Sequence, residues 1–365
     1  MTFSKLKIVA ALTALAMSTA ATSVVAQQLT TYAKISDTRP GNITVTPDNR
    51  VIITQQPLDG PSLRVVEVKS DGSKVPFPTL DWADGPEKGK VGIAATIGIT
   101  TASNGVVWIL DMGGENSPAQ LVAWDSKADK LHKVIKIPAD VRQPISFLQD
   151  FVLDEKHGKI YIADMTFTAP ASAMKPAFVV VDIESGLARR VLEGESRLMP
   201  VAHDVMINGA LMGFKGEDGS TQPWHLAVNA IAIDPAFEYV YFGSINSGDV
   251  FRIAAAALAD ETQGDAALAT MIERYADKRP NDGFIVDAEG RVISGDIETS
   301  AITRSGPNGI KTLAQDDKRL RWPDGFAFGP DGTLYVTANQ LNTHPALNGG
   351  VDGSDKEYFI LTLKP

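Results

Sequence analysis

The stretch that decides the fold occurs twice, as DGFIVDAEG at residues 282–290 and as DGFAFGPDG at residues 324–332. Each copy joins Asp-Gly-Phe to a short apolar run and then to a tight turn that ends in glycine. Four weaker copies of the same phrase precede them along the chain. Units of roughly 40–55 residues built from short strands are typical of the blades of a β-propeller. We therefore predict an all-β fold, a six-bladed β-propeller.

The two ends of the chain are expected to close this ring. The segment 29–35 has strand character but precedes the first unit, and we expect it to pair beside the segment 357–363 in the last blade. The chain has no cysteine, so this pairing would take the place of a disulfide. Residues 197–226 interrupt the spacing between the third and fourth units. Insertions in repeat folds fall in loops, often on the binding face.

The first residues are typical of an export signal. Lys5 and Lys7 precede an apolar run at 8–21, and small residues follow at 24–26. We predict a cleaved signal peptide at 1–26 and a single propeller domain at 27–365, periplasmic or secreted. A retained membrane anchor is the alternative, although the apolar run is shorter than the approximately 20 residues that span a bilayer.

Composition excludes several classes of function. The net charge is −10 and the pI is near 5.1, without a long basic run, so neither nucleic acid nor an anionic membrane is an expected partner. The absence of cysteine excludes thiol catalysis, and only five histidines are present. No phosphate-binding loop of the Walker type occurs, and no organic cofactor is expected. The expected partner is a small-molecule ligand or substrate, and the oligomeric state stays open.

Aligning the six units on their turns brings one residue of each to the same point before the innermost strand. These residues are Gly41, Ile97, Gln149, Asn229, Asp282 and Asp324. Asp-Gly pairs often only make turns, but here each unit already has its turn several residues later. Carboxylate and amide oxygens are the ligands that Ca²⁺ prefers. We therefore predict a site for Ca²⁺ or another divalent cation, with Asn229, Asp282, Gln149 and Asp324 as its ligands.

The ends of the second strands should return to the same face, because neighbouring strands are antiparallel. They add Asp111, Asp164, Asn246, Asp296 and Asn339 to the wall of the predicted site. Of these, Asp164, Asp296 and Asn339 are taken as candidate ligand-binding residues, although such residues often only cap turns. Without a cation, neighbouring carboxylates repel, which raises the pKa of one of them and suits it to acid–base chemistry.

Several segments resemble the bacterial branch of the major royal jelly protein and yellow family. The closest phrases are LRWPD at 320–324 and LYVTANQL at 334–341. This resemblance implies a six-bladed propeller that is related to gluconolactonases or to dopachrome-converting proteins. A more distant likeness is to the SMP-30/gluconolactonase family, which holds a divalent cation with one Glu, two Asn and one Asp.

The SMP-30 pattern transfers to this chain only in part. Asn229 and Asp282 match two of its ligands, and Gln149 stands where an Asn is expected. Gly41 occupies the position of the Glu, and Asp324 would compensate from the sixth blade.

Three functions follow as hypotheses. The first is a metal-dependent hydrolase of lactones or esters, in which a cation polarises the carbonyl and Asp282 positions or deprotonates the attacking water. The second is a non-enzymatic protein that binds small aromatic or amine ligands between Trp322, Phe284 and Phe326, with Trp224 and His225 of the insertion as further candidates. These aromatics could instead belong to the blade cores. The third is isomerisation of a dopachrome-like compound, which only the resemblance implies.

Overall fold

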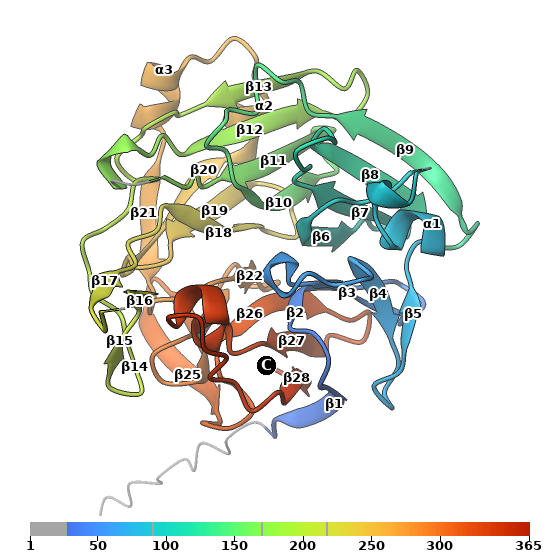
Figure 1. Ribbon diagram of the computed structural model, residues 1–365. Helices are drawn as coiled ribbons and strands as arrows, with labels where there is room; N and C mark the ends of the chain where they lie inside the picture. Colours follow the sequence, from blue (N-terminus) through green and yellow to red (C-terminus); the bar gives the residue numbers. More distant parts are fainter. Residues whose placement is uncertain (1–27, 90, 169–170, 217) are drawn as a thin grey trace, which may run out of the picture.

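The computed structural model describes residues 28–89, 91–168, 171–216 and 218–365. The predicted signal peptide, residues 1–26, lies outside the described residues. Six four-stranded antiparallel sheets surround a common centre, which confirms the predicted six-bladed propeller (Figure 1). Within the described ranges, no helix is both long and apolar enough to cross a membrane.

Each blade runs outward from an innermost strand. The first three consist of β2 (Pro40–Val45), β3 (Val51–Gln55), β4 (Val65–Val68) and β5 (Lys74–Pro76); β6 (Thr96–Thr101), β7 (Val106–Asp111), β8 (Gln120–Asp125) and β9 (Lys130–Lys136); and β10 (Leu148–Asp154), β11 (Lys159–Asp164), β12 (Ala177–Asp182) and β13 (Ala188–Val191). The last three consist of β18 (Val228–Ile233), β19 (Tyr239–Ser244), β20 (Asp249–Ala254) and β21 (Glu273–Asp277); β22 (Phe284–Val286), β23 (Val292–Asp296), β24 (Ala301–Gly306) and β25 (Gly309–Gln315); and β26 (Pro323–Phe328), β27 (Leu334–Ala338), β28 (Tyr358–Leu363) and β1 (Thr30–Ile35). Short helices α1 (Leu80–Ala83), α2 (Ala255–Ala259) and α3 (Asp265–Thr270) lie in the connections.

The sixth blade contains strands from both ends of the chain. β1 pairs antiparallel with β28, with Ile35 opposite Tyr358 and Thr30 opposite Thr362. The predicted closure of the ring is therefore confirmed. Because the N-terminal strand completes a sheet that begins at residue 323, the first and last blades cannot separate without breaking a strand ladder.

The apolar core lies between neighbouring blades rather than at the centre. One cluster joins Trp108 and Leu121 of the second blade to Phe151 and Val179 of the third. Both faces of a blade are therefore covered, and strands such as β7 are buried along their whole length. This explains why the strands read as short apolar runs instead of alternating polar and apolar residues.

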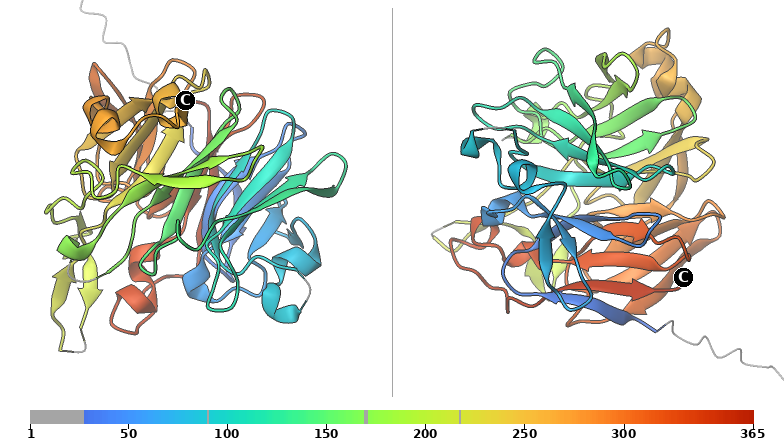
Figure 2. Two further views of the ribbon diagram at one scale, coloured as in Figure 1. Left: turned by 90° about the horizontal axis from the view of Figure 1, so that it is seen from above. Right: turned by 90° about the vertical axis from the view of Figure 1, so that its right-hand side faces the viewer.

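Three connections cover one face of the ring. The insertion forms two hairpins, β14 (Met206–Ile207) with β15 (Ala210–Leu211) and β16 (Gly213–Lys215) with β17 (Thr221–Pro223). The connection from β27 to β28 contains the 3₁₀ turns η4 (Leu341–Thr343) and η5 (Pro345–Leu347), and the first blade adds η1 (Pro57–Asp59). Figure 2 shows these connections on the same side of the propeller. The remaining 3₁₀ turns are η2 (Pro86–Lys88) and η3 (Ala171–Ala173).

Candidate functional site

The innermost strands bring the aligned residues to the channel. Gly41, Ile97, Gln149, Asn229 and Asp324 are each the second residue of their strands, and Asp282 stands two residues before β22. The ladder is irregular at these points in five of the six blades. Such bulges bend the strand and re-aim side chains, here toward the channel.

Asp282 lies at the centre of this group. Its Oδ2 accepts a hydrogen bond from Trp322 Nε1 at 2.6 Å, and its Oδ1 accepts one from Asn229 Nδ2. The side chain is buried, and this burial raises the pKa of Asp282, while the two hydrogen bonds act in the opposite direction. Asp282 is therefore a buried carboxyl group held in a fixed orientation at the edge of a cavity.

Asn229 has one satisfied and one unsatisfied end. Its Nδ2 also donates to the backbone carbonyl of Asp282 at 2.9 Å, so both neighbours on that side are acceptors. The amide must therefore present its nitrogen to Asp282, which turns Oδ1 away. This buried Oδ1 has no hydrogen-bond partner in the described part of the chain. Buried acceptors usually have one, so the atom is available to a ligand.

Asp150 and Asn42 also belong to the site, and the sequence analysis missed both. Asn42 Nδ2 donates to Asp150 Oδ2 at 3.0 Å, which joins the first and third blades. Gly98 of the second blade permits this approach, since a Cβ there would lie 3.0 Å from Asp150 Oδ1. Burial, and then the charge of Asp282, raise the pKa of Asp150 to about 7. Both residues follow an aligned position by one place, which is the only signal that could have found them.

Asp324 is the third carboxylate of the channel. Its Oδ2 accepts a hydrogen bond from Asn339 Nδ2 at 2.8 Å, and the same amide donates to the carbonyl of Pro40 at 3.0 Å. Asn339 therefore positions Asp324 and joins the sixth blade to the first. Burial, followed by the charges of Asp282 and Asp150, holds the pKa of Asp324 well above its usual value.

The other predicted wall residues hold loops. Asp164 pairs with Arg190 and accepts hydrogen bonds from the backbone amides of Phe147 and Thr166. Asp296 accepts hydrogen bonds from two backbone amides in the turn that follows it. Neither of the two contributes to the lining of either channel cavity. The same is true of His225, which lies near the surface beside Asp204.

Above the carboxylates lies an apolar cavity of about 220 Å³, called the upper cavity. Polar groups enter it from Gln149, Asn229 and Asp282. Its apolar lining includes Met112, Phe147, Met165, Phe214, Trp224, Trp322, Leu341 and Leu347. Trp224 lies next to Phe214 and Trp322, with ring centroids 5.4 and 6.4 Å away. The buried Trp224 Nε1 has no hydrogen-bond partner among the described residues.

Below the carboxylates lies a second cavity of about 310 Å³, called the lower cavity. Asp150 and Asp324 line it together with Phe284 and Phe326. The three aromatic residues that were predicted to flank one ligand are thus divided, because Trp322 lines the upper cavity. A layer of polar side chains separates the two spaces.

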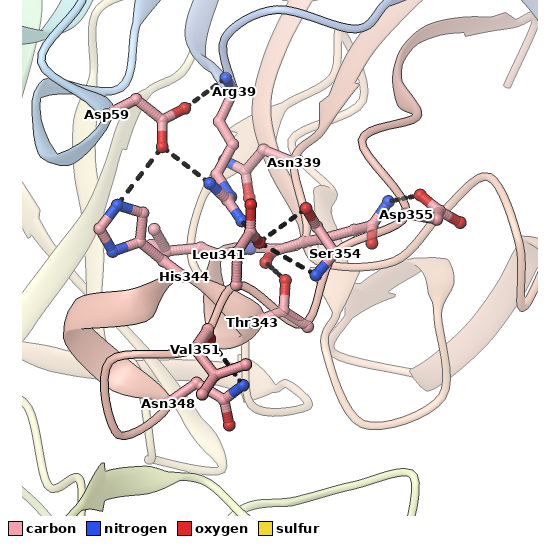
Figure 3. A network of polar contacts seen from close by, with 12 residues as sticks. Arg39, Asp59, Asn339, Leu341, Thr343, His344, Asn348, Val351, Ser354 and Asp355 are labelled. Atoms are coloured by element: carbon pink, nitrogen blue, oxygen red, sulfur yellow. Dashed lines mark hydrogen bonds and ion pairs between the residues drawn. The ribbon is translucent and has the colours of Figure 1, made fainter.

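An ionic network around the buried Arg39 fastens the cover of the upper cavity (Figure 3). Arg39 bridges Asp59 of η1 at 2.7 Å and Asp352 of the β27–β28 connection at 2.9 Å. His344 Nδ1 accepts from the amide of Ala346, so its Nε2 faces Asp59 as the donor at 3.3 Å. Burial, and then the charge of Arg39, lower the pKa of His344, whereas the nearby Asp59 and Asp352 act in the opposite direction. The network joins two of the three covering connections.

With this geometry in view, the comparisons with known proteins identify the family. The model of the major royal jelly protein family matches residues 95–363. The chain belongs to this family. No curated protein sequence matches it.

Solved structures share the fold at low identity. A gluconolactonase from Xanthomonas campestris is 13% identical with a TM-score of 0.55, covering 94% of this chain and 93% of that chain. A calcium-binding regucalcin from Agrobacterium tumefaciens is 17% identical with a TM-score of 0.52, covering 92% and 96%. A luciferin-regenerating enzyme is 11% identical with a TM-score of 0.54, covering 93% and 95%. At these identities the likeness shows the fold alone.

The residues present do not reproduce a complete cation site. Across the described ranges, no group of three or more His, Cys, Asp or Glu side chains is placed to hold a metal. A Cβ at Gly41 would lie 2.6 Å from Thr54 Oγ1, so the first blade has no room for a glutamate. Both oxygens of Asp282 already accept hydrogen bonds. The cation therefore stays a prediction, and we derive no chemical step through it.

Proposed function

We propose that this royal jelly family member binds a small aromatic molecule with an amine in the upper cavity. The observation that carries the proposal is the pairing of an aromatic, largely apolar cavity with one fixed carboxyl group, Asp282, at its polar end. Ligand sites of this kind combine an apolar lining with a few placed polar groups. An ammonium group beside Asp282 would favour its ionised form and offset the cost of burying it.

Two buried polar atoms without hydrogen-bond partners restrict the chemistry of the ligand further. Asn229 Oδ1 needs a donor and Trp224 Nε1 needs an acceptor. Leaving such a buried group without a partner costs about 1–3 kcal/mol. A ligand with an amine for Asn229 and a hydroxyl for Trp224 would satisfy both, whereas a pure hydrocarbon would satisfy neither.

Calorimetry with two probes tests this assignment. Dopamine carries ring hydroxyls and an amine, and phenethylamine carries the amine alone. We expect Trp224→Phe, which keeps a ring but removes the donor, to weaken dopamine roughly three- to tenfold and leave phenethylamine nearly unchanged. Trp82→Phe, whose side chain does not line the cavity, is the matched control. Absence of heat with both amines would end the proposal.

Metal-dependent hydrolysis of lactones or esters is the second candidate, because Asn229 Oδ1 is also a suitable cation ligand. Lactone hydrolysis measured with and without a chelator tests it. Activity that ignores both the chelator and Asp282→Ala would remove this candidate. Dopachrome-type isomerisation is supported only by the family and ranks below both.

Export to the periplasm or the exterior remains a proposal that rests on residues 1–26 alone. Sequencing the N-terminus of the protein after expression in a bacterial host tests it, because cleavage is expected near residue 26.

A further inference from the structure

The lower cavity has a charge pattern that the proposed function does not use. Its lining contains four carboxylates, Asp150, Asp324, Glu155 and Asp234, and within the described residues it contains no Lys, Arg or His. A cavity lined by one sign of charge concentrates ligands of the opposite sign. Burial raises the pKa values of Asp150 and Asp324, and a cation at the inner end would favour their ionised forms. The lower cavity therefore suits a cation.

The four carboxylates stand at two ends. Asp150 and Asp324 lie at the inner end, beside the polar layer of the channel, whereas Glu155 lies at the exposed mouth. Glu155 stands five positions after Asp150 in the chain, which corresponds to roughly 16 Å at the strand rise of about 3.3 Å per residue. Asp234 lies at the turn after β18, but it is buried and both of its oxygens accept hydrogen bonds from backbone amides of that turn. Glu155 accepts hydrogen bonds from the amide and the hydroxyl group of Ser103 and stays exposed.

The wall between these ends is apolar. It includes Ile99, Phe151, Ile231, Phe284, Ile285 and Phe326, which come from five of the six innermost strands. Such a surface binds methylene groups, and the faces of its phenylalanine rings attract ammonium groups. A hydrated inorganic ion would gain nothing from this wall.

The inner end offers an unused hydrogen-bond acceptor. Asp324 is 6% exposed, and Asn339 satisfies its Oδ2. No hydrogen bond from the described part of the chain reaches its Oδ1. By contrast, both oxygens of Asp150 accept hydrogen bonds, from Asn42 and from the backbone amide of Phe151. An ammonium group, with three donors, could bind Asp324 Oδ1 and share the charge of Asp150.

We propose that the lower cavity is a second binding site and that its ligand is a linear aliphatic polyamine. One terminal ammonium group binds at Asp150 and Asp324, the methylene chain lies along the apolar wall, and a second cationic nitrogen lies near the exposed Glu155. A compact metal ion fits less well, because its oxygen ligands must converge within about 2.3–2.6 Å of one point. Here the carboxylates are divided between two distant ends.

Calorimetry on the mature chain with three probes tests the site. Spermidine has two ends and several charges, hexylamine has one charged end, and 1,6-hexanediol has none. We expect affinity to fall in that order. Glu155→Gln should weaken spermidine binding by up to about fivefold and leave hexylamine binding unchanged, because an exposed charge pair contributes little. Asp324→Asn should weaken both amines.

Each of the following results would overturn the proposal. Equal binding of 1,6-hexanediol and spermidine would show that charge plays no part. An unchanged affinity of Glu155→Gln for spermidine would refute the two-ended arrangement. Trp224→Phe alters only the upper cavity, so loss of spermidine binding in that variant would place the ligand there instead. Dopamine binding provides the separate readout for the upper cavity.

Discussion

Replacing Asp150 with asparagine should stabilise the protein at pH 8 and destabilise it by about 1 kcal/mol at pH 4, where only the lost hydrogen bond from Phe151 counts. The pKa of Asp150 is about 7 in the folded protein, against 3.8 for the free side chain. The folded state therefore binds more protons than the unfolded state between these values. The free energy of unfolding of the natural protein therefore falls as the pH rises from about 4 to about 7, because the folded protein must then ionise a buried carboxyl group.

The size of the effect follows from the same shift. A difference of about 3 pKa units at about 1.4 kcal/mol per unit sets a ceiling of about 4 kcal/mol. An asparagine at 150 can keep the hydrogen bond from Asn42, but its amide nitrogen cannot accept from the backbone amide of Phe151. That lost bond costs about 1 kcal/mol, which leaves a net gain of about 3 kcal/mol at pH 8.

Urea denaturation at pH 5, 6, 7 and 8, with a chelator present, measures this effect. The free energy of unfolding of the natural protein should fall across the series relative to that of the variant. Glu115→Gln, at an exposed position, controls for the loss of one negative charge. If the free energy of unfolding of the natural protein and of Asp150→Asn changed in parallel with pH, the idea that no positive charge balances the channel carboxylates would be refuted. A bound cation would also flatten the slope, and repeating the series with added Ca²⁺ separates the two cases.

Three further predictions concern other parts of the fold. Lys278→Met should raise the free energy of unfolding at pH 7 by at most about 5 kcal/mol, because burial lowers the pKa of Lys278 to about 7. The natural protein should then gain stability as the pH rises from about 7 towards 10.5, and an equal gain in the variant would contradict this reasoning. Gly98→Val should destabilise the protein by about 2 kcal/mol or more in thermal unfolding, because the Cβ of the new valine would lie 2.9 Å from the ring of Phe151. An unchanged melting temperature would show that the third blade can move away from the second. Arg39→Gln should speed hydrogen exchange at residues 341–353 without affecting β7, because it removes the positive charge that joins Asp59 to Asp352. Exchange that rises equally in all strands would indicate global destabilisation instead.

Much of the channel was predictable because repeats are equivalent around one axis. The alignment on turns placed Gln149, Asn229, Asp282 and Asp324 at the same level of their blades, and the structure brings Asn229 and Asp282 into direct contact. Asp150 was missed because an irregular ladder turns two successive residues toward the channel. Alternation along a regular strand would have pointed the second of them away.

The division of the aromatic residues was not predictable either. Phe284 and Phe326 follow Asp282 and Asp324 by two places, and a strand advances by about 3.3 Å per residue, so they lie further along the channel. Trp322 precedes the strand and lies on the other side of the polar layer. Their spacing is consistent with this order along the axis, but only the structure shows that the channel contains two separate cavities at these levels.

The pattern of repeated segments in the sequence was sufficient to determine the number of blades, the closure of the ring by residues 30–35 and 358–363, and the level of the channel at which the polar residues meet. Repeated short strands with turns at similar intervals can bury their apolar faces only against one another, so the pattern already implies the ring. The tertiary structure alone decided which oxygens stay unsatisfied, where the channel is blocked and what covers it. These properties depend on contacts between side chains from different blades and loops, and such contacts leave no periodic trace in the sequence.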